Sequence, residues 1–140
     1  RLLKVVRGLE QELRDTLRRE HNTTLPRFDV MSALSRHPEG LKMSQLSGVL
    51  RVSNGNVTGI ADRLSEEGLV ERIPVPGDRR AMMLRLTPAG TAQFARQAQA
   101  HEDWINEKLR GISSEEARAM AARLQAFAAQ TEEKEKANAQ

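Results

Sequence analysis

The chain has 140 residues, of which 39% are hydrophobic and 29% are charged. That length provides for one domain with a single core, and that composition excludes a wholly disordered chain. The net charge is only +3, so the positions of the basic side chains matter more than their sum. The sequence contains no Cys, which excludes disulfides, thiolate nucleophiles and thiolate metal sites.

The sequence shows no sign of a membrane segment or a leader. No apolar run approaches the roughly 20 residues that a membrane-spanning helix needs, and the start at Arg1 lacks a signal-peptide pattern. We therefore expect a cytoplasmic protein with no membrane partner. Because the sequence begins with Arg rather than Met, we also expect part of the first helix to precede it.

The first 40 residues predict two helices. Apolar residues at spacings of three and four, such as Leu9, Leu13 and Leu17, indicate an amphipathic helix over 1–21. The stretch 22–24 reads as a break, and Pro26 is well placed as the first residue of a second helix. Residues 38–40, which include Pro and Gly, end that helix.

Two short helices and a tight turn follow. Ser44 is a suitable N-cap for the first of them, and Ser53 for the second, which Gly68 closes. We expect the first to face inward with Leu46, Val49 and Leu50. The second has one apolar face, made by Val57, Ile60, Ala61 and Leu64. This arrangement predicts a helix-turn-helix.

A β-hairpin and two long helices complete the chain. Residues 69–73 and 81–87 read as short strands around a turn rich in Pro and Gly, which makes a wing. Thr87 and Pro88 then start a helix that can run to residue 110, where Gly111 stops it. Ser113 and Glu116 form a capping box for a last helix that frays from residue 132 onward.

The predicted fold is mainly α with a small β-hairpin. A winged helix-turn-helix lobe occupies about 25–87, and helices at 1–21 and 88–135 flank it. The flanking helices carry more apolar surface than one small lobe can cover, so we expect them to be dimerisation helices. The residues expected at that interface are Leu109, Ile112, Met120, Leu124 and Phe127.

Residues 78–87 carry the most specific motif in the sequence. They read Asp-x-Arg, then three residues, then Leu-x-Leu-Thr, and the stretches 46–53 and 68–72 agree in order and spacing. In these motifs the chain resembles the MarR family of transcriptional regulators, along essentially its whole length. The resemblance implies a single MarR-type domain over 1–140.

The resemblance also implies which residues contact DNA. Those on or beside the DNA-facing side of the recognition helix are Asn54, Asn56, Thr58 and Arg63. Asn can bond adenine through two edges in the major groove, and Arg pairs with guanine or with phosphate. The plainer interpretation of Ser53 and Gly55 is that they only form the turn and the cap. Gly55 and Gly59 each weaken a helix, and they could instead mark a close approach of DNA backbone.

In similar proteins one wing Arg enters the minor groove and an Asp holds a wing Arg in place. Carried over, this makes Arg79 or Arg80 the inserted residue and Asp78 the wing-stabilising residue, with Arg80 as its partner. The alternative is an exposed ion pair that stabilises the hairpin by less than about 1 kcal/mol.

The resemblance further implies a homodimer on double-stranded DNA with a pseudo-palindromic operator. Related regulators bind small aromatic or anionic ligands between the dimerisation helices and the lobe. We therefore expect a repressor that an effector releases, with an aromatic acid or its coenzyme A thioester as the effector. Candidate lining residues are Arg7, Arg27, Phe28, Met31, Arg36, His37 and Trp104.

Other function classes fit less well. His21, His37 and His101 lie far apart in sequence with no Cys and no partner pattern, so we expect neither an enzyme nor a metal or cofactor site. The alternative that remains is a winged-helix protein-interaction adaptor that does not bind DNA.

Overall fold

The computed structural model describes residues 1–50 and 54–138, and for Asn54 and residues 131–138 it describes the backbone only. The chain folds into two compact units, residues 1–100 and residues 101–140. No helix in the described part of the chain is long and apolar enough to cross a membrane.

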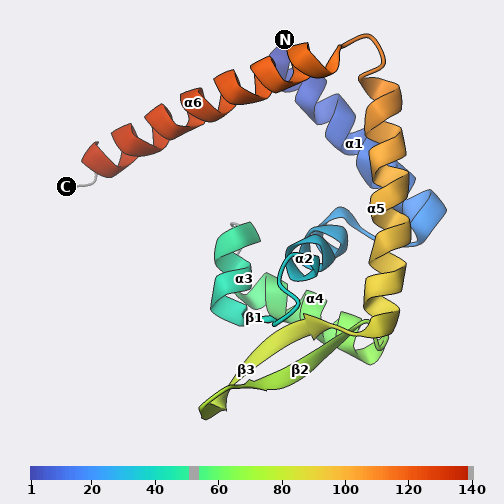
Figure 1. Ribbon diagram of the computed structural model, residues 1–140, viewed down its shortest axis with the longest axis vertical. Helices are drawn as coiled ribbons and strands as arrows, with labels where there is room; N and C mark the ends of the chain where they lie inside the picture. The colour runs from blue at the N-terminus through green and yellow to red at the C-terminus, as the bar shows by residue number, and fades with distance from the viewer. Residues whose placement is uncertain (51–53, 139–140) are drawn as a thin grey trace. The chain divides into compact units, whose positions relative to one another are not determined.

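The helices and strands alternate as expected for a winged helix. The helices are α1 (Leu2–His21), α2 (Leu25–Ser35), α3 (Met43–Leu50), α4 (Asn54–Glu66), α5 (Pro88–Lys108) and α6 (Ser114–Asn138). The strands are β1 (Leu41–Lys42), β2 (Val70–Val75) and β3 (Asp78–Leu86). Figure 1 shows α2, α3 and α4 on one side of the sheet, with the β2–β3 hairpin extending beyond them. The predicted fold class is confirmed.

The three strands form an antiparallel sheet in the order β1-β3-β2. Leu41 of β1 lies opposite Leu84 of β3, and Val70 of β2 lies opposite Leu86. Because Leu84 and Leu86 alternate with more exposed neighbours, only one face of β3 enters the core. Strand β1 was not predicted from the sequence, and both predicted strands of the hairpin are shorter than the observed ones.

The core of the first unit joins α2, α3, α4 and the sheet. Thirteen buried residues form it: Val30, Met31, Ala33, Leu34, Leu41, Leu46, Val57, Ala61, Leu64, Leu69, Val70, Leu84 and Leu86. This cluster fixes the helix-turn-helix on the sheet, because α4 and the base of the hairpin share it.

Helix α5 starts with the cap that the sequence predicts, whereas α2 begins at Leu25, one residue before the predicted Pro26, with a cap that was not predicted. Thr24 Oγ1 accepts from the backbone N–H of Arg27 at 3.5 Å at the start of α2. Thr87 Oγ1 accepts from Gly90 N–H at 3.0 Å and donates to the Gly68 carbonyl at 2.7 Å. One hydroxyl therefore caps α5 and also holds the turn that follows α4.

Gly90 is required by a close approach between α5 and the start of the hairpin. A Cβ built at Gly90 would lie 1.9 Å from the carbonyl oxygen of Leu69, which is backbone and cannot rotate away. The first turn of α5 can therefore lie against the chain entering β2 only because residue 90 has no side chain.

The second unit begins within α5 and contains α6. Ser113 Oγ accepts from Glu116 N–H at 3.2 Å, and a Glu116 carboxylate oxygen accepts from Ser113 N–H at 2.8 Å. This capping box confirms the predicted start of α6. Those hydrogen bonds hold the pKa of Glu116 below its ordinary value, with the bond from the Ser113 backbone as the largest cause. The helix runs to Asn138, whereas fraying was expected from residue 132.

Two details of the predicted α3 are wrong. The helix begins at Met43, so Ser44 lies inside its first turn and is not its N-cap. Instead, Gln45 Oε1 accepts from the backbone N–H of Lys42, three residues earlier, at 2.9 Å. The Gln45 side chain thus satisfies a backbone donor just before the helix begins. Val49 is 55% exposed and does not face the core. The predicted cap at Ser53 lies outside the described residues.

Candidate nucleic-acid interface

Helix α4 has one buried face and one polar, exposed face. Val57, Ala61 and Leu64 have no exposed surface, as their spacing of three and four predicts. The residues on the outside that were predicted to contact DNA are Asn56, Thr58 and Arg63, and all three are exposed. The side chain of Asn54, also predicted to contact DNA, lies outside the described residues. The core therefore holds the helix while its polar face stays open to a partner.

The first turn of α4 favours an anion. It contains no acidic residue, so no carboxylate within this turn offsets the positive end of the helix dipole. Gly55 and Asn56 in this turn are exposed. A phosphate group could approach this end of the helix closely.

Packing within the chain does not account for the two glycines in α4. A Cβ built at Gly55 or Gly59 would meet no atom within 4 Å. Neither residue has a positive φ, so an alanine could adopt the same backbone conformation. The interpretation that something outside the chain approaches here therefore stays open.

The wing presents two arginines at its tip. Gly77 has φ 79°, a conformation that glycine adopts at no steric cost, and it turns the chain from β2 into β3. Arg79 and Arg80 follow on β3 and are exposed. Two fixed positive charges at the end of a narrow hairpin suit a phosphate-lined groove.

Asp78 stabilises the wing through the backbone of Arg80. Its Oδ1 accepts from the backbone N–H of Arg80 at 3.0 Å. Arg80 is the partner that the resemblance implied, and the recorded contact is with its main chain. A short Asp side chain commonly bonds the backbone N–H two residues along, which fixes a turn. The side chain of Arg80 is then not needed to hold the wing.

Two ion pairs that sequence reasoning missed fix the hairpin in place. Arg72 of β2 pairs with Asp62 of α4, and Arg85 of β3 donates to Glu71 of β2 at 2.7 Å and 3.0 Å. Each pair is partly exposed and contributes less than about 1 kcal/mol. The first pair ties the wing to the recognition helix, and only the cross-strand position of Glu71 opposite Arg85 could have suggested the second.

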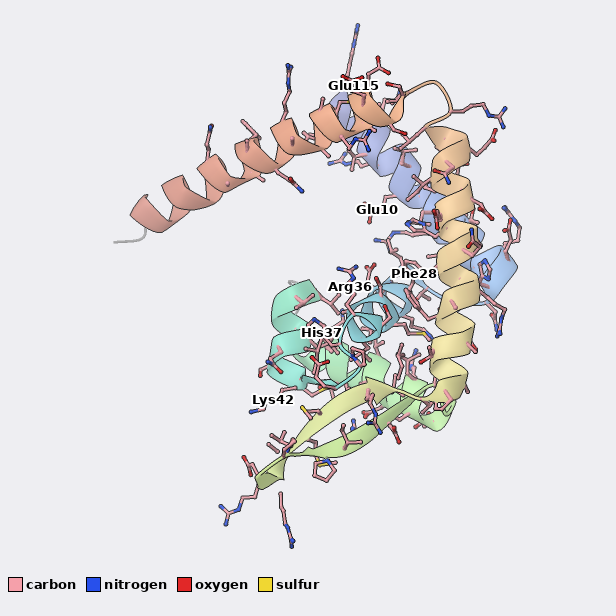
Figure 2. The ribbon with its side chains drawn as sticks, in the orientation of Figure 1. Glu10, Phe28, Arg36, His37, Lys42 and Glu115 are labelled. Carbon is pink, nitrogen blue, oxygen red and sulfur yellow. The ribbon has the colours of Figure 1, made fainter. Side chains whose placement is uncertain are left out.

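The predicted effector residues do not gather in one place. Met31 is fully buried and Phe28 is 7% exposed, with its ring centroid 5.5 Å from that of Phe94. Figure 2 shows Phe28 projecting from α2 toward α5. Both side chains are core residues with little surface for a ligand, because α2 is covered on more than one side.

The other candidates have separate surroundings. Arg27 donates to Glu67 at 2.8 Å, while Arg36 and His37 lie just beyond the end of α2 (Figure 2). Arg7 is exposed on α1. Trp104 belongs to the second unit, where its ring stacks on that of His101 with the centroids 6.1 Å apart. In the described part of the chain no cluster of acidic and histidine side chains could hold a metal ion.

Comparison with known proteins gives one family. The model of the MarR family matches residues 21–81, which cover α2 to the beginning of the wing's second strand. The transcriptional regulator PecS of Dickeya dadantii is 33% identical over 91 residues, or 64% of this chain and 55% of PecS. The chain thus spans about half the length of that relative.

Solved structures resemble the chain over most of its length. A MarR family transcriptional regulator from Silicibacter pomeroyi is 32% identical, with a TM-score of 0.74 over 93% of this chain and 89% of that one. A mutant MarR from E. coli, crystallised in complex with operator DNA, is 25% identical, with a TM-score of 0.77 over 90% of each chain.

Proposed function

Because this chain belongs to the MarR family of winged-helix transcriptional regulators, we propose that it binds double-stranded DNA in a sequence-specific manner and regulates transcription. One observation carries the proposal. A recognition helix with an exposed polar face lies on the same small core as a hairpin that ends in two exposed arginines. The likeness to a structure containing operator DNA supports it.

In the proposed complex, α4 enters the major groove and the wing contacts the minor groove. Asn56, Thr58 and Arg63 then face base edges or phosphates, and Arg79 or Arg80 enters the minor groove. Asp78 acts through the wing backbone and needs no contact with DNA. The positive end of the α4 dipole would attract a phosphate and help to set the position of the helix.

We propose that the protein acts as a homodimer. Within the first unit, α1 exposes a series of apolar side chains: Leu2, Leu3, Val5, Val6 and Leu9. Within the second unit, Leu109, Met120, Leu124 and Phe127 are exposed, from 39% to 69%. So much exposed apolar surface is unusual for a monomer. A two-fold dimer would place two recognition helices about one DNA turn apart, so the operator would be a pseudo-palindrome.

We also propose repression that a small aromatic acid relieves. A pocket of about 210 Å³ has apolar walls from Leu25, Pro26, Leu50 and Ile60, and its charged lining residues are Glu10, Arg14 and Asp29, with Arg14 paired to Glu10. A single aromatic ring suits this volume, whereas a coenzyme A thioester is far larger. Asn56 and Ile60 of α4 also line the pocket, so a ligand there would act directly on the recognition helix.

A selection from genomic fragments tests the DNA-binding proposal. The purified protein should enrich fragments that share one pseudo-palindromic sequence, and benzoate should release them if the effector proposal holds. The Arg63→Ala variant should lose the enrichment, whereas Arg110→Ala, an exposed arginine paired with Glu107 near the end of α5, should keep it. Enrichment of no shared sequence would favour the adaptor without DNA binding.

A further inference from the structure

Helix α4 carries two acidic residues on the side that faces away from the core, which we call its outward side. Because successive residues of an α-helix are turned by about 100°, this side lies opposite the buried residues Val57, Ala61 and Leu64. Two glycines lie on it in the first half of the helix, and two carboxylates in the second half. The residues of the outward side are Gly55, Gly59, Asp62 and Glu66.

Asp62 lies close to the residues that are proposed to contact DNA. It follows Thr58 by four residues, so it lies one helical turn of about 5.4 Å further along the same side. Its side chain is 49% exposed. Salt screens the repulsion between two negative charges only beyond roughly 8–10 Å. A free carboxylate at residue 62 would therefore repel the phosphates of any DNA that Thr58 reaches.

Arg72 of β2 supplies the charge that balances this carboxylate. A terminal nitrogen of Arg72 donates to Asp62 Oδ1. Arg72 lies opposite Leu84 in the hairpin, and Leu84 is buried in the core that α4 shares. Opposite residues of paired strands point to the same face of a sheet, so Arg72 points toward α4. The hairpin thus places a guanidinium beside the carboxylate of the helix.

The pair adds little to the attachment of the hairpin. Arg72 and Asp62 are 45% and 49% exposed, and water weakens an ion pair that is so accessible. Helix α4 and the hairpin already share buried Leu64, Val70 and Leu84. The loss of the pair would leave that packing unchanged. Its effect should therefore appear in binding to a negatively charged partner rather than in folding.

We propose that Arg72 is a positioning residue for DNA binding and that it acts by neutralising Asp62. The guanidinium holds the carboxylate and cancels its charge, so the half of α4 that carries Thr58 meets the phosphates without repulsion. Arg72 itself contacts neither a base nor a phosphate. This inference rests on the proposed DNA binding, because the charge of Asp62 matters only when phosphates approach α4.

A double-mutant cycle tests the inference, with affinity for the selected operator measured by fluorescence anisotropy at several salt concentrations. Arg72→Gln should weaken binding about tenfold, because it frees the Asp62 carboxylate. That loss should shrink as salt rises, since salt screens the repulsion. Asp62→Asn also breaks the pair but leaves no free carboxylate, so it should not weaken binding. Adding Arg72→Gln to Asp62→Asn should then cost less than about threefold.

The second ion pair of the hairpin provides a matched control. Arg85 and Glu71 are 42% and 43% exposed, much like the first pair. Their strand neighbours Leu86 and Val70 are buried, so this pair lies on the opposite face of the hairpin, away from α4. Arg85→Gln should change operator affinity less than about threefold. The urea midpoints of the two arginine variants should agree, because each loses only an exposed pair.

Three results would overturn the inference. Equal losses from Arg72→Gln with and without Asp62→Asn would mean that Arg72 contacts DNA directly. A loss for Asp62→Asn as large as that for Arg72→Gln would mean that the pair only holds the structure. An equal loss for Arg85→Gln would mean that any positive charge on the hairpin has the same effect. If the wild type binds no DNA, the proposed function fails and this inference with it, whereas wild-type binding without the coupling overturns the inference alone.

Discussion

Replacing Gly59 with alanine should make the free protein more stable and its complex with DNA weaker. Glycine inside a helix costs about 1 kcal/mol relative to alanine, because the unfolded chain loses more freedom. A methyl group at residue 59 meets no atom within 4 Å, so no clash offsets that gain. With a urea m-value of about 2 kcal/mol/M, the unfolding midpoint should rise by about 0.5 M at fixed protein concentration.

The same methyl group should interfere with DNA. Gly59 lies on the exposed side of α4, one turn before Arg63, where the helix would lie against the groove wall. We expect operator affinity to fall about tenfold, equal to about 1.4 kcal/mol, when fluorescence anisotropy is measured at one salt concentration. Opposite signs in the two assays would separate a functional glycine from a merely tolerated one.

Gly90→Ala is the matched control for the structural part of this reasoning. The same change there brings Cβ to 1.9 Å from the Leu69 carbonyl oxygen, so the urea midpoint should fall sharply. A lower urea midpoint for Gly59→Ala would contradict the claim that a methyl group at residue 59 has room. A raised midpoint with unchanged DNA affinity would refute the close approach of DNA.

Three further changes have definite expected outcomes. Arg80→Ala should lower operator affinity and reduce the salt dependence of binding. The dimer should stay intact in analytical ultracentrifugation, because the Arg80 side chain is exposed. If the variant and the wild type show equal salt dependence, Arg80 does not contact DNA. Thr87→Val should lower the free energy of unfolding by about 1–2 kcal/mol in urea titration. The change removes both the acceptor for the Gly90 N–H and the donor to the Gly68 carbonyl. An unchanged free energy of unfolding would mean that the cap is not needed. Arg27 lowers the folded-state pKa of Glu67, so their pair stabilises the fold above the unfolded pKa of about 4.3 and is lost as pH falls through the lower folded value. Glu67→Gln should therefore differ from wild type by less than about 1 kcal/mol at pH 7 and converge with it near pH 3, and a difference that grows with acid would contradict this.

Local rules predicted the helix boundaries well. Thr87 followed by Pro88, and Ser113 followed three residues later by Glu116, are signals that lie within one turn of chain. The structure confirms both because the hydrogen bonds that they imply are local. Ser44 failed because the helix already begins at Met43, and the side chain that accepts a backbone N–H there is that of Gln45, from Lys42; a serine alone does not say which residue will cap.

Features that depend on distant segments were harder to predict. Strand β1 is only two residues long and exists because β3 pairs with it. Two residues are too few to show the alternation of apolar and polar side chains that indicates a strand. The same limit applies to Met31. Its helical spacing fits a pocket wall as well as a core, and only the packing around α2 decides for the core.

The candidate site was predictable in part. The residue types of α4 and the wing, and their exposure, follow from periodicity and from the Asp-x-Arg motif. The partner atom of Asp78 does not, since a carboxylate can accept from a guanidinium or from a backbone N–H at the same spacing. A polar pocket lined by Gln97 was not predictable, because its walls come from three stretches of the chain that lie far apart in sequence, 19–27, residue 67 and 93–97.

A salt titration of binding to the selected operator, beside a shuffled sequence of the same length, tests sequence-specific DNA binding most directly. We expect the operator to bind at least about a thousandfold more tightly than the shuffled sequence, with affinity for both falling steeply as salt rises. Equal affinity for the two sequences, or binding that salt does not weaken, would contradict a DNA-reading role for α4 and the wing.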